Sequence, residues 1–220
     1  MMIDVFDTTL YVKKTGTGKP LIFVHGNGED HTIFDVLVSR LKDHYTCYQI
    51  DSRNHGRSKI TDIFSYEQMA EDTKELIKIL KLERPHFLGF SDGAIIGLIL
   101  AMKYPTTLDH MMICGANLHP RGLKKQVRNH MIQTYKETKS PWINMMIEQP
   151  NISFRRLHQA KIPVLVVAGE KDVISYRHTL AIARNLPLSS YIILKEKHHD
   201  DYIVNRDDLT ELCLSFFIKN

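Results

Sequence analysis

The chain has 220 residues, of which 43% are hydrophobic and 25% are charged, values that are ordinary for a soluble globular protein. Its length allows one domain with a substantial core. The formal net charge of +4 includes no long run of like charges, and no stretch approaches the length of about 18 apolar residues that spans a membrane. We therefore expect a protein that binds neither nucleic acid nor a membrane.

The cysteines and the first residues bear on the cellular compartment. Cys47, Cys114 and Cys213 are odd in number, lie far apart and fall within apolar runs, which predicts buried free thiols. Free thiols are typical of a reducing compartment. The N-terminus lacks the basic region and apolar stretch of a secretory signal. These features predict a cytoplasmic protein, whereas the sequence gives no indication of oligomeric state.

Strand and helix patterns alternate along the chain. A hairpin of two segments with alternating apolar and polar residues comes first, and short buried strands then alternate with segments of helical spacing. Ser65 and Gln68 have the spacing of a helix-capping pair, and Pro105 ends a later helix. The expected strands cover residues 2–6, 9–14, 21–24, 47–50, 85–88, 111–114, 163–168 and 191–194. The expected helices cover residues 32–41, 65–80, 94–104, 176–185 and 207–218.

This rhythm predicts the fold class. Strands that alternate with helices form βαβ units, so we expect an α/β fold with a mainly parallel sheet covered by helices on both faces. The rhythm breaks between about residues 117 and 161, where only helix-compatible stretches occur. We expect a single domain over residues 1–220 with this segment as a short insertion.

Ser91 lies between a predicted strand and a predicted helix, in the stretch Gly89-Phe90-Ser91-Asp92-Gly93. The two glycines let strand and helix approach closely while the serine takes a strained backbone conformation. The strain projects the hydroxyl out of the turn, and the positive end of the helix faces the place where an oxyanion would form. The spacing G-x-S-x-G is that of a nucleophile, although Ser91 alone could also be an ordinary helix N-cap.

A base and an acid follow later in the chain. A serine hydroxyl is a good nucleophile at neutral pH only beside a base that is itself held by an acid. In open α/β sheets such groups gather at the carboxyl ends of the strands. Asp172 follows the predicted strand 163–168, and His198 and His199 follow the next strand. This order of serine, aspartate and histidine predicts a catalytic triad at one edge of the sheet.

With these residues in place, the chain resembles the α/β-hydrolase superfamily, in the esterase- and lipase-like branch with a small lid. The resemblance covers nearly the whole chain apart from the insertion at 117–161. Asn54 departs from the family, which usually has glycine there, but asparagine tolerates the left-handed backbone that the turn needs. The motifs, in the order of the family, are His25-Gly26, the Asp51-to-Ser58 turn, Gly89 to Gly93, Gly169-Glu170-Lys171-Asp172, and a late histidine before a C-terminal helix.

The resemblance implies a role for each of these residues. Ser91 attacks a carbonyl carbon, a late histidine accepts its proton and returns it to the leaving group, and Asp172 orients the imidazole. The backbone N–H groups of Asn27 and Asp92 form the oxyanion hole.

The family's interval to the last helix favours His199 as the base, with His198 as the alternative. Glu196 and Lys197 replace the small residues that usually precede this histidine. His198, His199 and the two aspartates after them could also be read as a metal cluster. Neighbouring side chains on a loop diverge, however, so we expect no metal.

The resemblance thus implies a hydrolase that cleaves small carboxylic esters through an acyl-enzyme and needs no cofactor. Thioesterase, amidase, C–C hydrolase and perhydrolase chemistry use the same triad, and a non-catalytic receptor can have the same fold. In the insertion, Trp142, Met145 and Met146 are candidates for the substrate pocket or for plain packing. The Asp92 carboxylate either attracts a positively charged substrate or, as we favour, is held in a hydrogen bond or salt bridge.

Overall fold

The computed structural model describes residues 1–218, and its eight strands form one sheet in the order β1-β2-β4-β3-β5-β6-β7-β8. The strands are β1 (Met2–Val5), β2 (Thr8–Thr15), β3 (Lys19–Val24), β4 (Tyr45–Ile50), β5 (His86–Phe90), β6 (Met111–Cys114), β7 (Val164–Gly169) and β8 (Ser189–Leu194). The α-helices are α1 (Asp35–Leu41), α2 (Tyr66–Ile79), α3 (Asp92–Lys103), α4 (Lys125–Thr138), α5 (Pro141–Glu148), α6 (Tyr176–Asn185) and α7 (Thr210–Ile218). Short 3₁₀ turns are η1 (His31–Phe34), η2 (Pro120–Gly122) and η3 (Phe154–Gln159).

Parallel pairing brings the ends of the central strands to one edge of the sheet. The β1–β2 and β2–β4 pairs are antiparallel, and the other neighbouring pairs are parallel. The registers align Val24 with Gly89 and Phe90 with Cys114, all at or next to the ends of their strands. The loops after β3, β5 and β6 therefore leave from the same edge. The predicted α/β fold with a mainly parallel sheet is confirmed.

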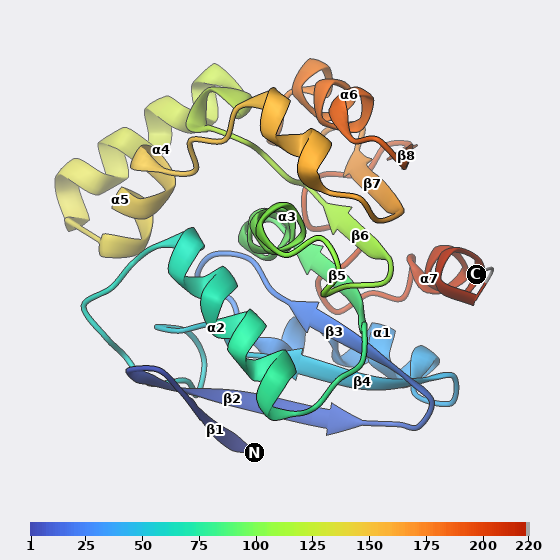
Figure 1. The fold of residues 1–220 in the computed structure, drawn as a ribbon. Helices are drawn as coiled ribbons and strands as arrows, with labels where there is room; N and C mark the ends of the chain where they lie inside the picture. The colour runs from blue at the N-terminus through green and yellow to red at the C-terminus, as the bar shows by residue number, and fades with distance from the viewer. Residues whose placement is uncertain (219–220) are drawn as a thin grey trace.

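Alternating side chains bury the two faces of this sheet in separate clusters. In β3, Ile22 and Val24 belong to one cluster, and Leu21 and Phe23 to the other. The first cluster includes buried residues of α2, α3 and α6, and the second includes those of α1 and α7. Figure 1 shows α2 and α3 in front of the sheet and α1 behind it. Helices therefore cover both faces, as the uninterrupted apolar strands require.

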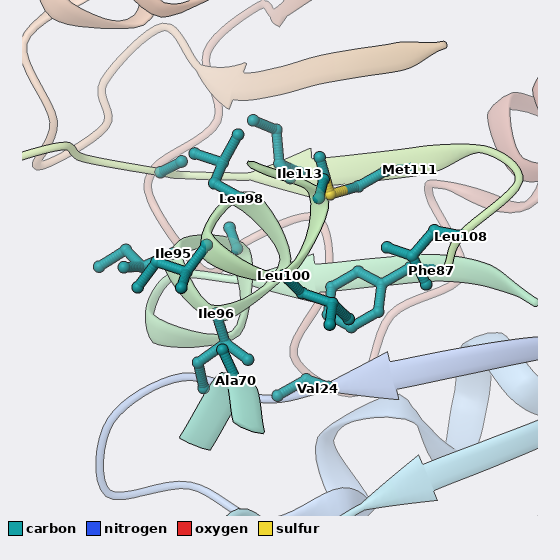
Figure 2. Close-up of a cluster of buried hydrophobic side chains, with 14 of the residues drawn as sticks. Val24, Ala70, Phe87, Ile95, Ile96, Leu98, Leu100, Leu108, Met111 and Ile113 are labelled. Atoms are coloured by element: carbon teal, nitrogen blue, oxygen red, sulfur yellow. The ribbon is translucent and has the colours of Figure 1, made fainter. Parts of the chain in front are cut away.

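Helix α3 lies in the middle of the larger cluster. All its residues except Lys103 are buried, a pattern that fits a helix packed on every side. Figure 2 shows Ile96 of α3 against Ala70 of α2, and Leu100 of α3 beside Phe87 of β5. Because α3 begins directly after Ser91, this packing fixes the position of the serine relative to the sheet.

The predicted elements are confirmed, with boundaries displaced by a few residues. The expected helix over 32–41 begins as the turn η1, where the Asp30 carboxylate accepts the Thr32 N–H at 2.8 Å, and continues as α1. Ser65 caps α2 by accepting the Gln68 N–H at 3.4 Å. The Gln68 side chain donates to Asp72 on α2 at 3.1 Å, one turn further on.

Between β6 and β7 the described chain has no strand, as predicted, and contains η2, α4, α5 and η3. Figure 1 shows α4 and α5 side by side, apart from the helices that cover the sheet. None of the α4 residues is buried, so this helix rests on the rest of the protein through one partly covered face. Within residues 1–218, no helix combines the length and the apolar character needed to cross a membrane.

Candidate active site

Ser91 occupies a strained turn between β5 and α3. Its φ of 51° and ψ of −112° lie in a region that residues with a Cβ rarely adopt. A Cβ built on Gly89 would lie 2.3 Å from the carbonyl oxygen of Gly93, and one built on Gly93 would lie 1.9 Å from that of Val24. The turn can therefore form only with glycine at both positions. It holds the serine hydroxyl at the carboxyl edge of the sheet.

The loops after β7 and β8 bring an aspartate and a histidine to Ser91. His199 Nε2 lies 3.1 Å from Ser91 Oγ, and His199 Nδ1 lies 2.7 Å from Asp172 Oδ1. The backbone N–H of Ile174 donates to Asp172 Oδ1 at 2.9 Å, and that of Gly169 donates to Oδ2 at 3.3 Å. A continuous line of contacts thus joins the hydroxyl to a carboxylate that the backbone holds in place.

The charges along this line favour a histidine that can accept a proton. Burial lowers the pKa of His199, but the hydrogen bond and charge of Asp172 outweigh burial and raise it above 6.5. Burial raises the pKa of Asp172, but hydrogen bonds from His199 and the backbone outweigh it and hold it below 3.8. Asp172 is therefore ionised at neutral pH, and its charge would stabilise an imidazolium if His199 took a proton.

Of the two late histidines, the structure brings only His199 to Ser91. The His198 side chain is exposed, and its backbone N–H donates to Asp201 Oδ2 at 2.8 Å. The imidazole of His199 lies against Gly115, which follows β6 with a φ of 63°. A Cβ on Gly115 would lie 2.5 Å from His199 Cε1, so the absence of a side chain makes room for the ring.

Two residues that line the cavity together with Ser91 offer their backbone N–H groups as candidate donors. Asp92 begins α3, and Asn27 lies in the loop after β3. Within residues 1–218, neither N–H donates to a protein acceptor. The Asn27 side chain donates from Nδ2 to Asp92 Oδ2 at 2.9 Å, which ties the two segments together. These N–H groups could bind an oxyanion on the Ser91 side of the cavity, next to the positive end of α3.

His25 braces the loop that carries Asn27. Its Nδ1 donates to the carbonyl oxygen of Gly26 at 2.7 Å, and its Nε2 accepts the N–H of Ser52 at 3.1 Å. Burial lowers the pKa of His25 to about 4, so the ring is neutral and has one donating and one accepting nitrogen. The turn after β4 contains Asn54 at a φ of 66°, the left-handed conformation expected there.

The Asp92 side chain points into hydrogen bonds. It is only 5% exposed, and its Oδ1 accepts the Tyr66 hydroxyl at 2.8 Å while Oδ2 accepts the Asn27 amide. Burial raises the pKa of Asp92. Because both oxygens already have donors, the carboxyl borders the cavity without a free oxygen directed at a substrate cation. This arrangement favours the interpretation that Asp92 is structural.

A cavity of about 410 Å³ opens at Ser91 and extends under the inserted helices. Val127 and Met131 of α4 and Met146 of α5 form part of its apolar wall. Of the other two lid residues predicted for the pocket, Met145 is 2% exposed within the larger core cluster, and neither it nor Trp142 lines the cavity. Trp142 packs against Phe64, with ring centroids 5.4 Å apart.

Two groups of possible metal ligands lie outside this cavity among the described residues. One consists of Asp30, His31 and Asp51, and the other of His86, Asp109 and His110. Asp51 Oδ1 already accepts both the backbone N–H and the ring of His31, at 2.7 and 2.8 Å. In the second group, Asp109 forms ion pairs with Lys19 and Arg84, which compete with a cation for its oxygens.

Comparisons with known proteins show the family of this chain. Residues 19–141, more than half of the chain, match the family model described as alpha/beta hydrolase fold. The chain belongs to the α/β-hydrolase family. It is 24% identical to the AB hydrolase superfamily protein YisY of Bacillus subtilis (strain 168) over 94% of this chain and 95% of that protein. It is 27% identical to the human serine hydrolase BPHL over 97% of this chain and 84% of that protein.

The fold of this α/β hydrolase also matches solved structures. The enol-lactonase from Burkholderia xenovorans LB400 superposes with a TM-score of 0.83 and 18% identity over the whole of both chains. Other matches bear the names of a putative esterase/lipase from Haemophilus influenzae and a meta-cleavage product hydrolase from Pseudomonas fluorescens IP01. These names include an esterase/lipase, a lactonase and a meta-cleavage product hydrolase, so membership of the family leaves the scissile bond open.

Several residues of this α/β hydrolase site were missed from the sequence. Glu29, Tyr66 and Asp200 border the cavity, as do the two α4 residues Val127 and Met131. Glu29 follows the recognised His25-Gly26 pair by three positions, which is the one signal that could have drawn attention to it. The α4 residues carry no motif, because apolar residues at helical spacing read equally well as core.

Proposed function

We propose that this chain is a serine hydrolase that cleaves small, uncharged carboxylic esters through an acyl-enzyme. Ser91 Oγ attacks the ester carbonyl while His199 takes its proton, and His199 then returns that proton to the departing alcohol. Water repeats the same steps on the acyl-serine and releases the acid. Asp172 orients His199, and the N–H groups of Asn27 and Asp92 stabilise the oxyanion.

The observation that carries this proposal is the line of contacts from Ser91 Oγ through both nitrogens of His199 to Asp172. It lies beside a cavity that is also lined by Asn27 and Asp92, whose N–H groups have no acceptor in the described part of the chain. An ordinary N-cap serine would accept a hydrogen bond from its own helix. Ser91 makes no such side-chain bond, which supports the nucleophile.

The charge of the cavity supports an uncharged acyl group. Three carboxyl side chains border it, those of Glu29, Asp92 and Asp200, and none of the described residues that line it is lysine or arginine. An acyl group that carries a carboxylate would find no positively charged side chain in this cavity and would lie beside other carboxyl groups, so its binding would be unfavourable. We expect kcat/KM for the acetyl ester of p-nitrophenol to exceed that for the succinyl half-ester at least tenfold.

We also propose that residues 117–161 form a lid within one domain. The support is that α4 and α5 contribute Val127, Met131 and Met146 to the wall of the cavity that opens at Ser91. A short lid of this kind leaves room for small acyl groups.

Replacement of the nucleophile tests the mechanism. We expect Ser91→Ala to lower kcat for p-nitrophenyl acetate by about 10⁴-fold, because the members of a triad act as a unit. His199→Ala should lose activity to a similar extent. The neighbouring variant His198→Ala is the matched control and should remain within a few-fold of the wild type, since its side chain is exposed. Near wild-type turnover by Ser91→Ala would exclude the mechanism.

A substrate panel separates esters from the other bonds that such a site can cleave. Matched ester, thioester and amide substrates with the same acyl group would be compared on the wild type and Ser91→Ala. We expect the ester to have the highest kcat/KM. A fluorophosphonate probe adds an independent readout, because it labels a reactive serine whatever the natural substrate is. Failure to label Ser91 would favour a binding protein over an enzyme.

A further inference from the structure

Glu29 lies at the active site without a part in the triad. It borders the cavity, and its Oε2 accepts the backbone N–H of Gly26 at 2.8 Å. The place where a Cβ of Gly26 would stand is 2.7 Å from Glu29 Oε2 and 3.0 Å from Ser91 Cβ. The carboxyl and the serine side chain therefore approach the same glycine from two sides. Only glycine at position 26 leaves room for both.

This contact holds the segment on which the oxyanion site depends. Gly26 precedes Asn27, which lines the cavity and whose N–H the proposed mechanism assigns to the oxyanion. The Glu29 backbone N–H also donates back to the Gly26 carbonyl oxygen, at 3.4 Å. The side chain and main chain of Glu29 thus close a tight turn around the Gly26–Asn27 peptide. Loss of the carboxyl would release the Gly26 N–H, which belongs to the preceding His25–Gly26 peptide, and would loosen the turn that leads into Asn27.

The same carboxyl adds charge where the reaction is sensitive to charge. The titratable groups that face it are His199 from the loop after β8, Asp200 beside it, and Asp92 at the start of α3. An ionised Glu29 favours the imidazolium of His199, which cannot act as a base. It also opposes the negative charge that develops on the substrate oxygen. A protonated Glu29 has neither effect and can still accept the Gly26 N–H.

We propose that Glu29 is a positioning residue of the oxyanion loop whose protonation state sets the pH dependence of hydrolysis. This inference rests on the proposed serine hydrolase function. Burial raises the pKa of Glu29 to about 7, although the Gly26 N–H and His199 act in the opposite direction. The carboxyl therefore changes its charge near neutral pH.

The test is the pH profile of kcat/KM for p-nitrophenyl acetate between about pH 5 and pH 9, for wild type, Glu29→Gln and Glu29→Ala. Glutamine keeps an acceptor for the Gly26 N–H but carries no charge. We expect Glu29→Gln to move the rising limb about half a unit toward lower pH and to raise the plateau about threefold. Glu29→Ala should lower kcat about tenfold with little change in KM, because the loop loses its anchor.

Glu83→Gln is the charge-matched control, since Glu83 is exposed in the loop before β5, at the other end of that strand. Its profile should superimpose on that of the wild type. A Glu29→Gln profile that also superimposes would overturn the proposal, as would equal losses in Glu29→Gln and Glu29→Ala. Thermal melts identify any variant that is misfolded. The pH dependence of labelling by the fluorophosphonate probe repeats the test without a substrate. Full activity of Ser91→Ala would instead reject the proposed function itself.

Discussion

Gly115 has no side chain, and this leaves room for the imidazole of His199. A Cβ at this position would stand 2.5 Å from His199 Cε1, and the φ of 63° is strained for any residue with a Cβ. We expect Gly115→Ala to push the ring away from Ser91 and to lower kcat at least tenfold. Steady-state kinetics and a thermal melt of the same sample would measure the two effects separately.

Gly16 offers the matched control for this prediction. It also has a positive φ, of 87°, and a Cβ there would lie 2.3 Å from the carbonyl oxygen of Lys42, in the turn before β3. Gly16→Ala should therefore lose stability while the folded fraction keeps its kcat. If Gly115→Ala behaves like Gly16→Ala, with a lower melting temperature and unchanged kcat, Gly115 does not position the histidine.

At the scale of residues, the candidate site residues that could be predicted from the sequence are those whose positions follow from the local backbone structure. Ser91 is recognisable because a strained turn needs flanking glycines, and His199 and Asp172 because they follow strands. Glu29 and Gly115 are less clearly marked: Glu29 contacts Gly26 in its own loop but has no motif of its own, and Gly115 lies against His199, which is far away in the sequence. Such contacts follow from the packing of several loops, which no spacing in one segment reveals.

At the scale of elements, the inserted helices form part of the wall of the cavity. Met146 of α5 lines it, and removal of its side chain leaves space beside the acyl group. We expect Met146→Ala to raise kcat/KM for p-nitrophenyl butyrate relative to the acetate by about fivefold, since one or two buried methylene groups contribute about 1 kcal/mol. The ratio of the two specificity constants is the measurement.

The preceding residue provides the control. Met145 is 2% exposed in the core and does not line the cavity. Met145→Ala should destabilise the protein by about 2 to 5 kcal/mol and leave the butyrate-to-acetate ratio unchanged. An unchanged butyrate-to-acetate ratio in Met146→Ala would show that this part of the lid does not select the substrate. The two methionines also show why the sequence could not assign the lid: adjacent residues of one short helix face the core and the cavity.

At the scale of the whole molecule, alternation of strands and helices was enough to predict a mainly parallel sheet with helices on both faces. The order of the strands was not predictable in this way. β4 pairs with the antiparallel β2 on one side and the parallel β3 on the other, and β5 lies beside β3. The position of each strand in the sheet depends on the direction in which the preceding connection crosses the sheet. Because the apolar strands have similar sequences, this direction cannot be predicted from them.

Buried histidines distributed over the fold predict how stability changes with pH. Burial lowers the pKa values of His25, His86 and His178 from 6.5 to about 4. Between these values the three histidines bind more protons in the unfolded chain than in the folded protein, so their contribution to the free energy of unfolding rises with pH. The stabilisation is complete above about pH 6.5 and is lost as the pH falls toward 4. Chemical denaturation at a series of pH values in this window would measure it.

His86→Phe isolates one of these contributions. The ring of His86 is fully buried and stacked on Phe217 with centroids 4.8 Å apart, so phenylalanine can keep the stack without an ionisable group. We expect this variant to be at least as stable as the wild type at neutral pH and to take up about one proton fewer on unfolding near pH 5. An identical pH slope in wild type and His86→Phe would mean that His86 is protonated in the folded protein, which contradicts the effect of its burial.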